Sequence, residues 1–192
     1  PRWPPEQAGL CVALLSDLLR GPDAPPLLLL VTMRPVEVSG LPEGTRVMEL
    51  GSLSDAESRE LVDALSEQLA TTADAAALSR EAQGHPMFLR ELVQHIAQVG
   101  EAAGAVRLED ALLSRIARLE RGPQRLLDVL AVAHAPIPLR VAAQASTLEP
   151  AEAARALAVL RVAALTRSSG GSVEERVEPY HDRIREAVLG KL

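Results

Sequence analysis

Apolar residues recur at helical spacing along most of the chain beyond residue 53. A capping box that begins at Ser54 predicts a helix reaching about Leu69. Pro86 suits the first turn of another helix, which we expect to end before Gly100. The helices predicted from this pattern cover about residues 54–69, 73–83, 86–99, 108–120, 123–134, 138–146, 150–163 and 179–189.

Three short segments have the pattern of strands instead. Leu27–Thr32 is almost wholly apolar and bounded by prolines, which predicts a strand buried on both faces, as in a parallel sheet. Arg46–Leu50 is a candidate second strand, and a helical apolar stripe over Glu6–Arg20 precedes both. Near the carboxyl end, Leu165–Arg167 and Val173–Val177 flank a turn with two glycines, which predicts a β-hairpin.

The order of these elements predicts a mainly α fold in three parts. Residues 1–52 read as the last piece of an α/β sheet, residues 53–104 as a helical subdomain, and residues 105–192 as a winged-helix-like subdomain because helices there precede a small hairpin. The balance of acidic and basic residues changes near the boundary at residue 104. Residues 1–104 hold 7 basic and 15 acidic residues, whereas residues 105–192 hold 13 and 11.

Composition narrows the class of protein. The 192 residues carry a formal charge of −6, and no apolar run is long enough to span a bilayer. The single cysteine, Cys11, excludes an internal disulfide framework, so we expect a cytoplasmic setting. Aromatic residues make up only 2%, which argues against base-stacking surfaces for RNA or single-stranded DNA. Because the chain begins with Pro1, we expect it to be a piece of a longer protein.

Known catalytic motifs are absent from the sequence. Lys191 is the only lysine, so the phosphate-binding loop, which needs glycines and a lysine, is not in this chain. No acidic pair follows an apolar strand in the way needed to hold magnesium, and the four histidines lack metal-ligand spacing. We therefore expect no catalytic residues and no metal ligands here, and an enzyme only in combination with other parts of a parent protein.

Three short features remain as candidate ligand contacts. Arg34 follows the predicted strand after Thr32, where ligands of open α/β sheets bind, although its simpler interpretation is a solvated arginine before a proline turn. Gly84–Leu89 lies between two helices, and its simpler interpretation is a glycine stop followed by a proline start. Tyr180–Asp182 begins the last helix, where Asp182 complements the helix dipole and His181 could donate to a phosphate or simply be exposed.

Taken in order, these motifs resemble the STAND class of signal-transduction ATPases, which are relatives of the AAA+ proteins. The class includes apoptosome-forming ATPases, plant resistance proteins and MalT-like bacterial regulators. The stretches Gly84–Leu92 and Pro179–Val188 are most similar to bacterial multidomain ATPases linked to serine/threonine protein kinases or adenylate cyclases. The resemblance covers nearly the whole chain, and the order of the motifs, more than any one of them, makes it specific.

The resemblance implies an ADP/ATP-dependent signalling switch. Arg34 would read the γ-phosphate, Pro86, presented by Gly84, would pack against adenine, and His181 would contact the β-phosphate of ADP. Asp182 would support the start of the last helix, and Thr32 would support the end of the strand. Residues 53–104 would be the lid and 105–192 the winged helix of the nucleotide-binding module. Exchange of ADP for ATP would release the winged helix and permit assembly.

The sequence departs from this family near its start. Arg2-Trp3-Pro4-Pro5 stands where the family has a segment reading roughly Gln-Trp-Ala-Asp, so only Trp3 matches. The resemblance implies that the phosphate-binding loop and the carboxylates that hold Mg²⁺ lie upstream, in a P-loop half of the same protein. Effector or repeat domains and self-association are the other partners it implies. A parent with a degenerate nucleotide site stays open.

Two alternatives of a different class also stay open. The helix over Glu149–Ala163 would be the recognition helix of a DNA-binding winged helix, but its charge is zero and its surface is largely alanine, so DNA is not the expected partner. The second alternative is a nucleotide-free structural or protein-interaction module. The residues read as core are Leu10, Leu14, Leu18, Leu61, Leu65, Leu92, Ile96, Leu112, Ile116, Leu126, Leu130, Leu157 and Leu160.

Overall fold

A computed structural model describes residues 45–100, 106–169 and 175–192, together with the isolated positions 14, 17, 28, 30 and 32. The chain divides into two compact units, one formed by Pro1–Glu49 with Gly170–Val173 and the other by Leu50–Ser169 with Glu174–Leu192. The described part of the chain is mainly helical, with a small antiparallel sheet. All the elements labelled below belong to the second unit.

The first helices of this unit are α2 (Asp55–Gln68), α3 (Ala75–Ala82) and α4 (Pro86–Val99). Helix α2 begins with the predicted capping box: the Ser54 side chain accepts from the Glu57 N–H, and the Glu57 carboxylate accepts from the Ser54 N–H at 2.8 Å. These bonds to Ser54 hold the pKa of Glu57 below its ordinary value. The three predicted helices are confirmed, with ends moved by at most two residues.

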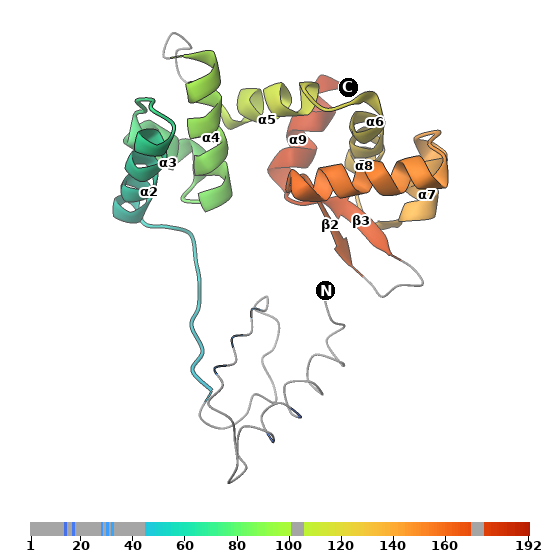
Figure 1. The fold of residues 1–192 in the computed structure, drawn as a ribbon, viewed down its shortest axis with the longest axis horizontal. Helices are drawn as coiled ribbons and strands as arrows, with labels where there is room; N and C mark the ends of the chain where they lie inside the picture. Colours follow the sequence, from blue (N-terminus) through green and yellow to red (C-terminus); the bar gives the residue numbers. More distant parts are fainter. Residues whose placement is uncertain are drawn as a thin grey trace. The chain divides into compact units, whose positions relative to one another are not determined.

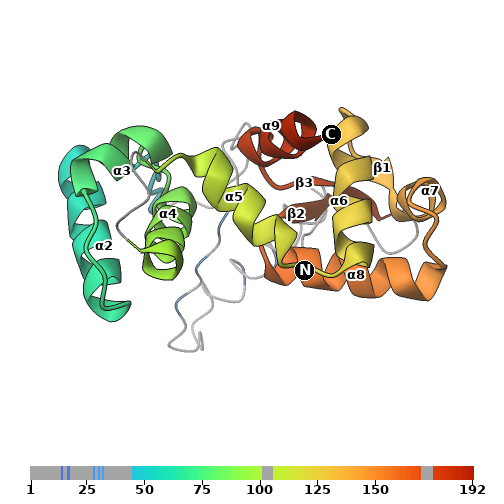
Figure 2. The same cartoon turned by 90° about the horizontal axis from the view of Figure 1, so that it is seen from above.

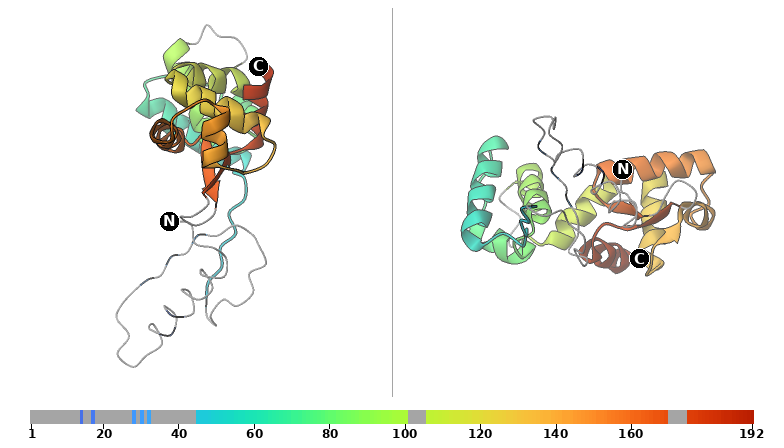
Figure 3. Two further views of the ribbon diagram at one scale, coloured as in Figure 1. Left: turned by 90° about the vertical axis from the view of Figure 1, so that its right-hand side faces the viewer. Right: turned by 90° about the horizontal axis from the view of Figure 1, so that it is seen from below.

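The following helices are α5 (Leu108–Ala117), α6 (Arg121–Val132), α7 (Leu139–Ala145), α8 (Pro150–Val162) and α9 (Asp182–Lys191). Figures 1, 2 and 3 show α2, α3 and α4 gathered in one group and α6 to α9 in another, with α5 passing between them. Helix α5 packs against α4 and also against α9. It therefore connects the two groups, and each of the helices predicted for this half of the chain is present.

Three short strands complete the second group, in the order β1-β3-β2. Strand β1 (Ile137–Pro138) was not predicted, because two residues with a proline give no period-two signal. Strands β2 (Thr166–Ser169) and β3 (Arg176–Pro179) form the expected hairpin, but each begins later than predicted. This register pairs Arg167 with Glu178 at 2.7 Å across the strands and buries Val177, and both contacts favour it.

The core runs through both helical groups as one cluster of buried residues. Eight of the predicted core residues are buried: Leu92, Ile96, Leu112, Ile116, Leu126, Leu130, Leu157 and Leu160. Leu61 and Leu65 are partly buried and pack against them. Each full burial of a leucine contributes about 1.5–3 kcal/mol, so this cluster is the main source of stability.

The expectations for the amino-terminal part are corrected where residues are described. Leu28 and Leu30 are 85% and 80% exposed and form no strand, and neither does Thr32 or residues 46–50. A buried strand needs neighbouring strands to pair its backbone groups, and the described residues supply none here. Leu14 is helical but 56% exposed, not core. Leu10, Leu18, Arg34 and the rest of the predicted helix over residues 6–20, apart from Asp17, lie outside the described residues.

Candidate functional site

The two motifs singled out in the second unit meet in the structure. The ring of His85 lies 4.5 Å from that of Phe88 and 5.4 Å from that of His181, measured between centroids. Phe88 and His181 are 4.9 Å apart and meet edge to face, at an interplanar angle of 80°. These three side chains, which we call the ring cluster, join the start of α4 to the start of α9.

Gly84 sets the path of the chain into the ring cluster. Its φ is +68°, and a Cβ added there would lie 2.3 Å from the carbonyl oxygen of Leu53. The Leu53 N–H donates to the Gly84 carbonyl at 2.9 Å, which holds the two segments in contact. Only glycine combines this backbone conformation with such a close approach. Gly84 is therefore a structural requirement of the turn that places His85 and Pro86.

Pro86 occupies the first position of α4 and is exposed. His85 is the N-cap residue of this helix, but its side chain makes no capping hydrogen bond. The imidazole lies instead against the rings of Phe88 and His181. Pro86 suits the first position of the helix because its ring fixes φ, and the N–H that it lacks would have no partner within the helix there.

His181 is the N-cap residue of α9. Its Nδ1 accepts a hydrogen bond from the Arg183 N–H at 3.2 Å, so a neutral ring carries its proton on Nε2. Asp182 follows in the first turn, where a carboxylate complements the helix dipole, and it is exposed. His181 therefore presents an N–H donor at the positive end of a helix.

His85 has a distinct electrostatic setting. Its Nδ1 is buried and has no hydrogen-bond partner. Burial lowers the pKa of His85 below 6.5, the neighbouring His181 lowers the pKa further, and a backbone hydrogen bond opposes the change. The setting of His85 therefore favours the neutral form of its ring.

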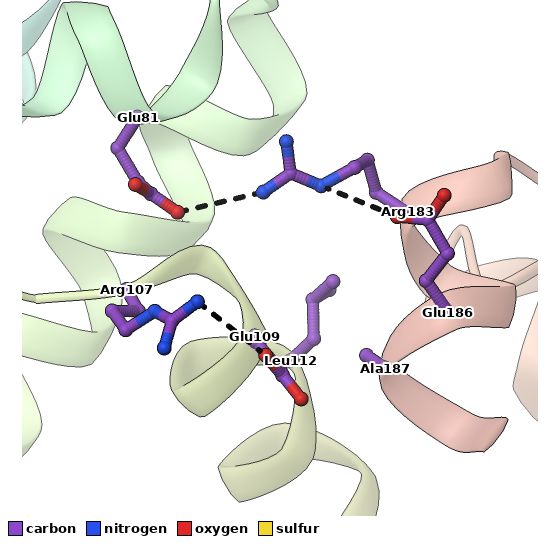
Figure 4. Close-up of a pocket in the computed structure, with 7 residues that line it drawn as sticks. All are labelled: Glu81, Arg107, Glu109, Leu112, Arg183, Glu186 and Ala187. Atoms are coloured by element: carbon purple, nitrogen blue, oxygen red, sulfur yellow. Dashed lines mark hydrogen bonds and ion pairs between the residues drawn. The ribbon is translucent and has the colours of Figure 1, made fainter. Parts of the chain in front are cut away.

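An open cavity of about 180 Å³ lies beside this region, where α3, α5 and α9 meet (Figure 4). Glu81 accepts from the Leu108 N–H at 2.9 Å and lies 3.5 Å from the Arg183 guanidinium. Three carboxylates and two guanidinium groups line the cavity, together with Leu112 and Ala187. Because the carboxylates outnumber the cations, this cavity does not suit a phosphate.

A second acidic residue connects the two helical groups. Glu91 on α4 is only 5% exposed and forms an ion pair with Arg115 on α5. Arg115 also donates to the carbonyl of Ala163, the C-cap residue of α8, at 2.5 Å. Glu81 and Glu91 therefore both tie the first group of helices to the second.

The structure unites some of the predicted site residues and not others. The Gly84–Pro86 turn and His181 belong to one region, linked through the ring cluster. Thr32 is exposed and in no regular element, and Arg34 lies outside the described residues. Sequence reasoning missed the roles of His85 and Phe88, although both lie within the motif and Phe88 is the only phenylalanine of the chain. A lone aromatic residue beside a histidine was the available signal.

Comparison with protein-family models, with curated proteins and with solved structures finds no match to this chain. Within the described residues, no group of three or more histidine, cysteine, aspartate or glutamate side chains is placed to hold a metal ion. None of the described helices combines the length and the apolar character needed to cross a membrane.

Proposed function

We propose that this chain is the regulatory part of a STAND-type ATPase and acts as an ADP/ATP-dependent switch in a multidomain cytoplasmic regulator. The observation that carries the proposal is the meeting of the Gly84–Phe88 motif with His181 in the ring cluster. Two motifs far apart in the sequence, each assigned to nucleotide contact by the resemblance, lie together in space.

The chemistry of this region supports a phosphate contact. A helix N-terminus favours anions because its N–H groups and dipole point outward. His181 adds an Nε2–H donor at the start of α9, as its Nδ1 already accepts from the Arg183 backbone. We assign the β-phosphate of ADP to His181 and adenine packing to the exposed ring of Pro86, with Asp182 supporting the helix start.

The order of elements supports the two proposed subdomains. Helices α2 to α4 would form the lid. The sequence α6-β1-α7-α8-β2-β3, with a sheet of order β1-β3-β2, is the arrangement expected of a winged helix. Residues upstream would supply the P-loop and the carboxylates for Mg²⁺, and Arg34 would read the γ-phosphate. Effector or repeat domains and further copies of the protein would be the partners.

One alternative is supported by a specific observation. The ring cluster and the Glu91–Arg115 pair join the two helical groups through the chain's own side chains. A structural or protein-interaction module that binds no nucleotide would need only these contacts to hold its two helical groups together. A DNA-binding role has less support, because Arg161 on α8 is engaged by Glu175 and Ser168 and the exposed surface of that helix is largely alanine and valine.

The test is the nucleotide content of the purified parent protein. The protein is denatured and the released nucleotide is identified, beside His181→Asn and His134→Asn variants. Asparagine is a good N-cap, so His181→Asn retains the helix cap while it removes the imidazole. His134 is exposed, lies in a turn with φ +55° that asparagine tolerates, and is the matched control. Stoichiometric ADP in the wild type and control, reduced in His181→Asn, supports the proposal. A wild type without nucleotide that binds no added ADP refutes it.

A further inference from the structure

The two histidines of the ring cluster hold equivalent positions on two helices. His85 is the N-cap residue of α4 and His181 is that of α9. The positive ends of both helix dipoles therefore meet where the two imidazoles lie 5.4 Å apart. Both imidazoles also contact the ring of Phe88. The two helix starts are therefore joined by one apolar ring and two imidazoles that can gain protons.

We propose that the ring cluster is a pH-sensitive latch, which holds the start of α4 against the start of α9 while the His85 imidazole is neutral and releases it when that imidazole gains a proton. The latch goes beyond the proposed nucleotide switch and requires no nucleotide.

Three features make a proton on His85 unfavourable in this position. The His85 Nδ1 is buried and has no hydrogen-bond partner in the structure. The neighbouring His181 ring, 5.4 Å away, also opposes a positive charge on His85. That charge would further face the positive end of the α4 dipole.

The charged groups on the neighbouring helices do not offset the cost of adding a proton to His85. The charged or titratable groups on the three helices that meet here are Arg80 and Glu81 on α3, Arg90, Glu91 and His95 on α4, and Asp182, Arg183, Arg185, Glu186 and Lys191 on α9. Helices α2 and α5, which pack against α4, add Asp55, Glu57, Arg59, Glu60, Asp63, Glu67, Glu109, Asp110 and Arg115. Glu81 is already engaged by the Leu108 N–H and by Arg183, and Asp182 is exposed. Burial and His181 remain the causes that lower the pKa of His85.

Release at the ring cluster would be local. Helix α4 stays tied to α5 through the ion pair of Glu91 with Arg115. The Glu81 bond to the start of α5 is likewise retained. The expected movement is therefore a separation of the two helix starts, not an unfolding of either helical group.

The chain allows a direct test by NMR. Phe88 is the only phenylalanine and there are four histidines, so nuclear Overhauser effects between the Phe88 ring and the His85 and His181 rings can be assigned without ambiguity. At about pH 7.5 these effects are expected for both histidines, and at about pH 5 those to His181 are expected to disappear, while far-UV circular dichroism is unchanged. Return to neutral pH should restore them.

Two variants provide the comparison. His134→Asn should leave the midpoint of the transition unchanged, because His134 is exposed and belongs to a different turn. His181→Asn keeps the α9 cap but removes the second imidazole, so the effects between His85 and Phe88, which both belong to the start of α4, should be present at both pH values. Overhauser effects between Phe88 and His181 that persist at about pH 5, or that vanish only together with the helical dichroism signal, would overturn the proposal.

Discussion

The carboxylate of Glu91 on α4 is buried and accepts a hydrogen bond from the guanidinium of Arg115 on α5. The same guanidinium donates to the Ala163 carbonyl at 2.5 Å, beyond the last turn of α8. Arg115 of α5 therefore links the preceding helix, α4, to the carboxyl end of α8, which lies much further along the chain. An ion pair in this position orients the helical groups, because each charge would be left without its partner if they separated.

Glu91→Met is expected to destabilise the fold by about 2–3 kcal/mol, since it leaves the Arg115 charge unpaired in a partly buried position. This loss of stability is smaller than that expected for a fully buried pair, because the Arg115 side chain is 28% exposed. Urea denaturation followed by circular dichroism measures the change.

The matching double variant distinguishes an ion pair from simple packing. Glu91→Met with Arg115→Met should recover most of the lost stability, because a buried pair replaced by apolar side chains is often neutral. Glu186→Met is the control, as Glu186 is 69% exposed and its distance to Arg183 is 3.9 Å, and its cost should stay below about 1 kcal/mol. A double variant no more stable than Glu91→Met alone would argue against the pair as the cause.

Gly84→Ala is expected to cost about 3 kcal/mol or more, because the new methyl group would lie 2.3 Å from the Leu53 carbonyl oxygen in a backbone with φ +68°. A variant at Gly100 separates the effect of the steric contact from the effect of the backbone conformation. Its φ is +84°, but an added Cβ would meet no atom within 4 Å. Gly100→Ala should therefore cost only what the backbone conformation imposes, about 1–3 kcal/mol. Equal losses of thermal stability in the two variants would contradict the contact with Leu53.

The helices of the second unit were predictable because their signals are local. Ser54 begins a capping box and Pro86 fixes a first turn, and both effects depend on residues within one helical turn. The hairpin was expected, but its register was not, because the ion pair of Arg167 with Glu178 and the burial of Val177 decide it. The strand predicted from Leu27 is not formed where described, since a strand depends on neighbours that a local pattern cannot supply.

The candidate site was predictable only in part. The sequence contains both motifs, and each by itself is consistent with a helix start. Their meeting depends on how α4 and α9 pack about α5, which no local pattern encodes. The same is true of Glu91, whose partner Arg115 lies on another helix. Tertiary contacts of this kind define the site, and periodicity shows only that the side chains belong to helices.

Stability is expected to fall as the pH drops below about 6.5, the ordinary pKa of histidine. The folded chain lowers the pKa of His85, so between the folded and unfolded values the unfolded chain binds more protons, and stability rises with pH in that window. The stabilisation is therefore present above 6.5 and is lost as the pH falls through the lower folded value. Urea midpoints between about pH 7.5 and pH 5.5 measure it.

His85→Phe should flatten this dependence, since it keeps an aromatic ring against Phe88 and removes the titrating group. His134→Asn should leave the slope as in the wild type. The pH range of these measurements lies above the range in which Glu57 gains a proton, because the bonds to Ser54 hold the pKa of that carboxyl below 4.5. An unchanged slope in His85→Phe would assign the pH dependence to another group.

The most direct test of the nucleotide switch compares the affinities of the parent protein for ADP and ATP, in the wild type and in His181→Asn. A switch requires differential contacts, since a ligand that binds both states equally shifts no equilibrium. We predict that loss of one charge-assisted hydrogen bond weakens ADP binding by about tenfold or more, and ATP binding by much less. Equal weakening of both nucleotides, or no change in either, would contradict the assignment of His181 to the ADP-bound state.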